Sequence, residues 1–403
     1  MKLNNRMKKI TVLSVLFLAT LIIFSCSKER NQDDYSGDEF ELIQTELTLP
    51  KVVNNYELVL GEHFLPPGKT YPKLNIVSLA ETQANNNRAT LGRVLFYDNT
   101  LSLDRNVSCG TCHDPTRAFS DEGQFSEGVG EVITKRNTLA LATTLSFKIS
   151  YNPIDPSMSG SKFSWDDSAS SLSQQVKNAF RNENEMNIDE EEIMHRIGEH
   201  PFYSVLFEKA YGDDKIDSER ISQAITSFVD AISSVHSKFD EGLERASQFS
   251  VENDFYNFTE AENRGKQLYN SNCASCHTDK HNFTVKTSGN NGLEMDYADK
   301  GVGGRLNRVD LFGVFKIPFL RNIELTGPYM HDGRFASLED VVDHYSDGIV
   351  AHENLSDELK NMDGTPRNLN LNQEDKDALV AYLKTLTDET IASDTRFMDP
   401  FRR

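Results

Sequence analysis

Two short strings constrain this chain more than any other feature. Each has the pattern C-x-x-C-H, and together they use four of the five cysteines: Cys109-Gly110-Thr111-Cys112-His113 and Cys273-Ala274-Ser275-Cys276-His277. Two thiols about one helical turn apart can each form a thioether with one vinyl group of a porphyrin, and the histidine that follows is carried under the iron. The pattern therefore predicts two covalently bound c-type haems, with His113 and His277 as iron ligands. A zinc site or a thioredoxin-like dithiol is the alternative, but neither needs a histidine after both pairs.

The fifth cysteine, Cys26, follows what the sequence predicts to be an export signal. Residues 1–9 carry four basic side chains and no acid, residues 10–24 are apolar, and Ser25 precedes the cysteine. Residues 23–26 resemble a bacterial lipobox, apart from the bulk of Phe24. We expect residues 1–25 to be removed and Cys26 to be lipidated, giving an exported, membrane-anchored lipoprotein on the periplasmic side or the outer surface. A plain cleaved signal or an uncleaved anchor helix is the alternative, although the apolar run is short for a bilayer span.

The chain is strongly acidic. It has 62 Asp and Glu against 42 Lys and Arg, and loss of the four basic leader residues changes the formal net charge from −20 to −24. Such a surface repels phosphate backbones, so the composition argues against a nucleic-acid binder. It favours a basic or neutral protein partner whose attraction weakens in salt, or it serves solubility alone.

Length and pattern predict a tether and two domains. Residues 26–48 are polar and acidic, which indicates a tether. The rest is too long for one core, so we expect domains at 49–250 and 251–390, each with one C-x-x-C-H, and a tail at 391–403. Strand signals are sparse, and helical spacing of apolar residues predicts a mainly α fold with helices in these segments: 171–180, 190–211, 218–235, 261–269 and 372–386.

From about residue 90 to residue 386 the chain resembles the bacterial dihaem cytochrome c peroxidases and their MauG-type relatives. The matching strings are LGRVLFYD at 91–98 with LS at 101–102, RN at 136–137, WDD at 165–167, EM at 185–186, FKIP at 315–318, LRN at 320–322 and LTGPYMHDG at 325–333. The resemblance implies two c-type-cytochrome-like haem domains packed face to face.

The resemblance implies that hydrogen peroxide binds at the first haem, on His113. Many members carry a distal histidine that must leave before peroxide enters. The matching position here is Val129, and no histidine lies between His113 and His195. Valine cannot ligate iron, so the resemblance implies a five-coordinate iron with an open distal side, a departure towards the MauG type.

Three further residues match the peroxide site of the family. Glu185 matches the distal acid that moves a proton between the two peroxide oxygens, although by itself it is one acid in a polar run. Gln175 matches a second polar distal residue. Trp165 is the only tryptophan; by itself it would be a core residue, and the resemblance places it between the haems as an electron relay.

At the second haem the resemblance points to Tyr345. It stands twelve residues past Gly333, where peroxidases of this family carry a methionine ligand and MauG-type enzymes carry tyrosine. A phenolate ligand lowers the iron's potential and stabilises oxidised iron. Met330 and His344 are rival ligands.

Calcium is a further expectation from the resemblance. Asn137, Thr326 and Pro328 match ligands of a calcium ion between the haems, and oxygen-only donors suit this ion. Ordinary turn residues are the alternative.

Three functions remain open on the sequence. The first is a peroxidase that takes electrons from a small donor protein such as cytochrome c. The second is a MauG-like oxidase of a partner protein, favoured by Tyr345 and Val129. The third is a dihaem electron carrier without enzyme activity. Homodimers are usual among relatives, but the sequence gives no sign of a dimer interface.

Overall fold

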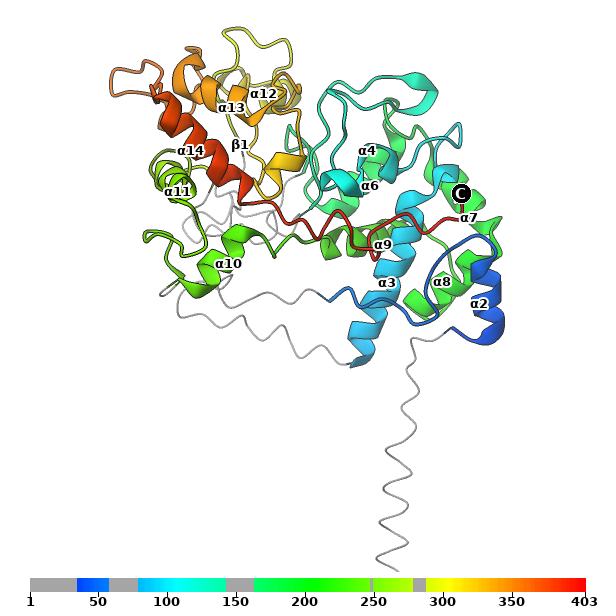
Figure 1. Cartoon of the computed structure of the whole chain (residues 1–403). Helices are drawn as coiled ribbons and strands as arrows, with labels where there is room; N and C mark the ends of the chain where they lie inside the picture. Colours follow the sequence, from blue (N-terminus) through cyan, green and yellow to red (C-terminus); the bar gives the residue numbers. More distant parts are fainter. Residues whose placement is uncertain (1–34, 58–78, 143–162, 247–248, 278–287) are drawn as a thin grey trace, which may run out of the picture.

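The computed structural model describes residues 35–57, 79–142, 163–246, 249–277 and 288–403. As expected, the fold is mainly helical, and its two apolar cores define two domains, each with one C-x-x-C-H motif (Figure 1). Within these residues no helix is both long and apolar enough to span a membrane. Cys26 and the predicted leader lie outside the described residues.

The helices of the first domain lie between residues 37 and 231. They are α2 (Gly37–Gln44), α3 (Leu79–Tyr97), α4 (Cys109–Cys112), α6 (Leu172–Arg181), α7 (Glu190–Gly198), α8 (Pro201–Tyr211) and α9 (Ser218–Ala231).

The second domain adds the only strands among the described residues. Its elements are α10 (Lys238–Arg245), α11 (Glu260–Asn272), β1 (Ser288–Gly289), α12 (Gly301–Leu306), β2 (Phe315–Lys316), α13 (Leu338–Asp343), a π-helical turn (His344–Gly348) and α14 (Gln373–Lys384). β1 and β2 pair antiparallel, with Ser288 opposite Lys316.

Each domain is built around a close crossing of two helices. Gly92 of α3 faces α9, where an added Cβ would come within 1.9 Å of the Ala224 carbonyl oxygen. Gly265 of α11 faces α14, and there a Cβ would come within 1.9 Å of the Ala378 carbonyl oxygen. In both domains, therefore, the helix that leads towards the C-x-x-C-H motif crosses the last helix of the domain with the two backbones almost in contact.

The packing assigns α10 to the second domain, although we expected the first domain to reach residue 250. Phe239 and Leu243 of α10 belong to the second apolar core, and the ring of Phe239 meets that of Tyr382 edge-on at 6.1 Å. The buried carboxylate of Asp240 accepts two hydrogen bonds from Arg321, both of 2.7 Å. The core therefore changes between α9 and α10.

The segment expected to be an acidic tether is folded from Tyr35 onward. The Ser36 hydroxyl accepts from the Glu39 backbone and the Glu39 carboxylate accepts from the Ser36 backbone, which caps α2. Ile43 and Leu47 are fully buried in the first core. Residues 35–48 are thus part of the first domain rather than a tether.

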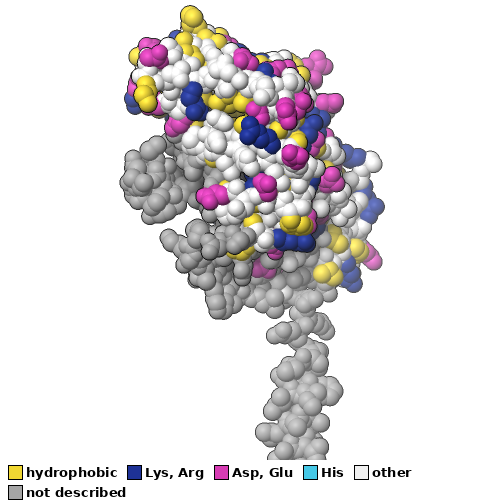
Figure 2. All heavy atoms as spheres, turned by 60° about the vertical axis from the view of Figure 1, so that its left-hand side comes forward, with side chains coloured by type: hydrophobic (Ala, Val, Ile, Leu, Met, Phe, Trp, Pro, Cys, Tyr) yellow, Lys and Arg dark blue, Asp and Glu magenta, His cyan; other side chains and the backbone are white. Residues whose placement is uncertain are grey.

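On the face of the molecule that Figure 2 shows, the described charged side chains of both signs are interspersed. Figure 2 shows the side of the molecule on which α11 and α14 lie, and acidic and basic side chains alternate there without a large patch of one sign. The net negative charge of the chain is therefore not gathered on this face, which supports the solubility reading for this part of the surface.

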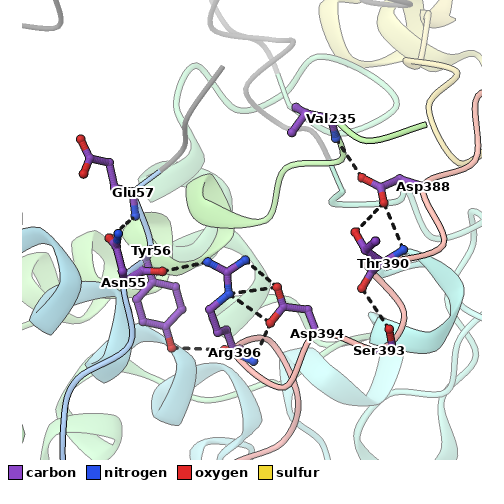
Figure 3. Close-up of polar contacts among 9 residues, drawn as sticks. All are labelled: Asn55, Tyr56, Glu57, Val235, Asp388, Thr390, Ser393, Asp394 and Arg396. Atoms are coloured by element: carbon purple, nitrogen blue, oxygen red, sulfur yellow. Dashed lines mark hydrogen bonds and ion pairs between the residues drawn. The ribbon is translucent and has the colours of Figure 1, made fainter. Parts of the chain in front are cut away.

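After α14 the C-terminal tail returns to the first domain, as its red trace shows in Figure 1. Figure 3 shows its first anchors, where Asp388 accepts from the Val235 backbone at 3.0 Å and Arg396 donates to the Asn55 carbonyl oxygen at 2.8 Å. Further on, the buried Phe397 accepts through its carbonyl from the Tyr97 hydroxyl at 2.6 Å. The tail fastens the end of the second domain to the first.

Candidate functional site

The first C-x-x-C-H motif opens onto a cavity of about 710 Å³. α4 holds Cys109 and Cys112 one turn apart, and His113 follows at its end. The His113 ring donates from Nδ1 to the Phe119 carbonyl oxygen at 2.9 Å, which leaves Nε2 as the ligating atom. Burial lowers the pKa of His113, which favours the neutral imidazole that metal ligation requires.

Glu185 lines the same cavity. One carboxylate oxygen accepts from the Asn182 side chain at 2.6 Å, and burial raises the pKa of Glu185 above its ordinary value. Glu185 is therefore partly buried in this cavity and not a fully exposed surface acid. Gln175 also lines this cavity, where its side-chain oxygen accepts from the Ser164 hydroxyl at 3.2 Å. A partly buried carboxyl with a raised pKa thus lines the same cavity as His113.

A second loop fixes the position of Glu185. The backbone of Val129 donates to the Glu185 carbonyl oxygen at 2.9 Å, and Gly128 lies so close that an added Cβ would come within 2.2 Å of the Asn184 carbonyl oxygen. Val129 itself is buried and does not line the cavity. Among the described lining residues, His113 is the one histidine.

The second motif opens onto a smaller cavity of about 200 Å³. Cys273, Cys276 and His277 line it, and no disulfide joins the four described cysteines of the two motifs. The His277 ring donates from Nδ1 to the Pro318 carbonyl oxygen at 3.1 Å, and burial lowers its pKa to about 4. Two thiols and a neutral imidazole in each cavity fit covalent haem attachment.

The rival ligands of the second site are separated by the structure. Tyr345 lies in the π-helical turn after α13 and lines the second cavity, and burial raises its pKa to about 12. His344 does not line this cavity, and its Nε2 lies 3.0 Å from the Asn291 carbonyl oxygen. Met330 does line it, with its sulfur accepting from the Asn291 side chain at 3.3 Å. Of these three candidates, Tyr345 and Met330 therefore line the second site.

Of the described residues, only Trp165 and Lys316 line both cavities. The indole N–H of Trp165 donates to the Asn137 carbonyl oxygen at 2.7 Å, and the Lys316 backbone donates to the Trp165 carbonyl oxygen at 2.7 Å. His331 meets the indole edge-on at 6.4 Å. Sequence reasoning missed Lys316; the signal was a lysine inside the apolar FKIP string.

Asn137, one of the three expected calcium ligands, contacts the loop that holds the other two. The Asn137 backbone donates to the carbonyl oxygen of His331, in the loop that contains Thr326 and Pro328. The Asn137 side-chain nitrogen donates to the Gln124 carbonyl oxygen at 3.1 Å, so its amide oxygen points another way. Among the described residues no three His, Cys, Asp or Glu side chains form a metal cluster. The expected calcium ligands are amide and carbonyl oxygens, and the absence of such a cluster has no bearing on them. The calcium site therefore stays a prediction.

Known proteins share this architecture. Residues 86–248 match the family described as di-haem cytochrome c peroxidase, and residues 262–387 match the family described as cytochrome c. The methylamine utilization protein MauG of Methylophilus methylotrophus is 30% identical, over 74% of this chain and 82% of its own length. The cytochrome c551 peroxidase of Nitrosomonas europaea is 29% identical, over 76% of this chain and 82% of its own length. A solved structure of a MauG-like protein associated with microbial copper homeostasis has a TM-score of 0.59 and 28% identity, and the match covers 78% of this chain and 92% of that one.

The chain therefore belongs to the di-haem cytochrome c peroxidase and MauG family. Membership implies two covalently attached haems, in agreement with the two cavities and their donor atoms.

Proposed function

We propose that the protein reduces hydrogen peroxide to water with electrons from a small donor protein such as cytochrome c. Each peroxide takes up two electrons and two protons and gives two waters. The observation that carries the proposal is the partly buried carboxyl of Glu185 in the cavity of Cys109, Cys112 and His113. When bound, the haem there supplies the iron on which peroxide coordinates and gains electrons.

The residues of this cavity supply positions and protons. Glu185 takes a proton from the near oxygen of peroxide and returns it to the far oxygen, so that water leaves. Asn182 and the Val129 backbone hold Glu185 in place. Trp165 would give one electron to the first site and take one back from the second, and Tyr345 would be a ligand of the second iron.

The test is peroxide turnover with reduced cytochrome c as donor. In Glu185→Gln the rate falls by about 10² to 10⁴ while both haems stay attached, because only the proton transfer is lost. Burial raises the pKa of Glu185, so on acidification the wild-type rate falls at a higher pH than an ordinary carboxyl would give. Glu185→Gln lacks this acid limb of the pH–rate profile.

Glu183 provides the matched control. It is exposed and lies two residues from Glu185, so Glu183→Gln keeps both the rate and the acid limb. A Glu185→Gln protein that turns over peroxide at the wild-type rate contradicts the role of the acid.

A MauG-like oxidase of a partner protein is the second candidate. Tyr345 in the second cavity favours it, as do relatives named MauG at 30% and 31% identity. In that reaction the two electrons come from a side chain of the partner instead of a donor cytochrome. Peroxide consumption without reduced cytochrome, coupled to oxidation of an added protein, would favour it. A bare electron carrier would show neither reaction.

The proposal also includes a membrane anchor and one bound calcium ion. Lipidation of Cys26 holds the enzyme on the outer side of a membrane, and Asn137, Thr326 and Pro328 bind one calcium ion between the domains. Cys26→Ser expressed with its leader should leave the membrane fraction. Chelation should remove one calcium per chain and change the haem spectra.

A further inference from the structure

The wall between the two cavities contains a buried charge. Lys316 on β2 and Trp165 are the two described side chains that line both cavities, and a backbone hydrogen bond of 2.7 Å joins them. The Lys316 side chain is 2% exposed, as is that of Asp167, its ionic partner. A charged side chain with so little exposure is rare unless it is paired.

The Lys316–Asp167 pair differs from its neighbour. Arg136 and Asp166 form a shorter ion pair of 3.0 Å nearby, but their side chains are 26% and 17% exposed, so solvent and salt screen them. The Lys316 ammonium lies 3.8 Å from an Asp167 carboxylate oxygen, beyond normal hydrogen-bond length. Its field is therefore screened little by water and extends into both cavities.

The segment that begins with β2 connects the wall to the second iron ligand. Lys316 donates through its backbone to Trp165, and two residues later the Pro318 carbonyl oxygen accepts from the His277 ring. Segment 315–318 therefore holds Lys316 at a fixed position relative to both the relay and the second site.

We propose that Lys316 sets the reduction potentials of both haems through its buried charge, with Asp167 as the countercharge that limits its effect. A nearby cation stabilises the reduced iron, which carries one positive charge less, and so raises the potential. The inference rests on the two haems that family membership implies and not on peroxidase turnover, so the two can fail separately.

The experiment is a spectroelectrochemical titration of the complete haem-loaded protein. Lys316→Met should lower the midpoint potentials of both haems by about 59 mV, a tenfold change in the one-electron equilibrium constant. Asp167→Asn should raise both potentials. A merely structural role predicts no such opposition of sign.

The exposed Lys215 provides a control for the loss of a lysine charge. Lys215→Met removes the cation of an exposed Lys–Asp pair, with Lys215 70% exposed, and leaves both potentials unchanged. If either Lys316→Met or Asp167→Asn binds fewer than two haems, the direction of the potential shift in the other variant tests the proposal. Unchanged midpoint potentials, or shifts of the same sign in Lys316→Met and Asp167→Asn, overturn the proposal.

Discussion

The indole N–H of Trp165 donates to the backbone carbonyl oxygen of Asn137 over 2.7 Å, in the wall that separates the two haem cavities. This contact fixes the ring between the two sites. A neutral carbonyl cannot take the proton, so an indole that loses an electron keeps its N–H. The tryptophan is thus placed to pass an electron without passing a proton.

Replacement of Trp165 should uncouple the haems. In Trp165→Phe we expect electron transfer between them to slow by at least about tenfold, corresponding to about 1.4 kcal/mol in the barrier. Stopped-flow mixing of the half-reduced protein with peroxide measures this step. Tyr256→Phe, at an exposed ring, should leave it unchanged. An unaltered rate in the tryptophan variant would remove the relay role.

The close approach at Gly128 gives a prediction for Glu185. In Gly128→Ala the new Cβ would lie 2.2 Å from the Asn184 carbonyl oxygen and 3.0 Å from that of Glu185, so the turn must shift. We expect slower peroxide turnover with full haem content and a stability loss of about 1–3 kcal/mol. Gly198→Ala, whose Cβ meets nothing within 4 Å, is the control for both measurements.

The second iron ligand is tested by a pair of variants. Tyr345→Phe should change the spectrum and potential of the second haem, whereas Met330→Leu should leave both as they are. A tyrosine binds iron as the phenolate, and burial raises the pKa of Tyr345 to about 12, which favours the protonated phenol, so acidification should release it. The reverse pattern in the two variants would assign Met330 instead.

The tail should contribute strongly to stability. Phe397 is 3% exposed and packs near Tyr56 and Phe228, with ring centroids 6.2 Å apart in both pairs. Phe397→Ala should cost about 3–5 kcal/mol of unfolding free energy, measured by denaturant titration. Phe401→Ala, at a partly buried ring of the same tail, should cost clearly less. Equal losses would mean that the tail is not anchored at Phe397.

Helical patterns in the sequence predicted only about half of the described α-helices and missed others, among them α2, α3 and α10. The segment 171–180 became α6 almost unchanged, since its apolar residues face one core. The segment 190–211 is split into α7 and α8, because Pro201 starts a new helix. α3 was not predicted, since its first half is a polar run, ETQANNN at 81–87, with no apolar stripe.

Site residues could be predicted from the sequence only where they stand in a contiguous motif or in a string that matches the family. The C-x-x-C-H motifs are contiguous in the sequence, and family strings pointed to Glu185, Trp165 and Tyr345. Lys316 and Asp167 meet only after two distant segments pack together, and no local pattern carries that information. The folding of residues 35–48 against the first domain was likewise invisible, because it depends on the tail returning from the other end of the chain.

Low-temperature electron paramagnetic resonance of the resting oxidised protein tests the central claim most directly. The account predicts one high-spin ferric haem, open beside Glu185, and one low-spin ferric haem bound by His277 and Tyr345. Two low-spin signals, or fewer than two haems per chain, would contradict it.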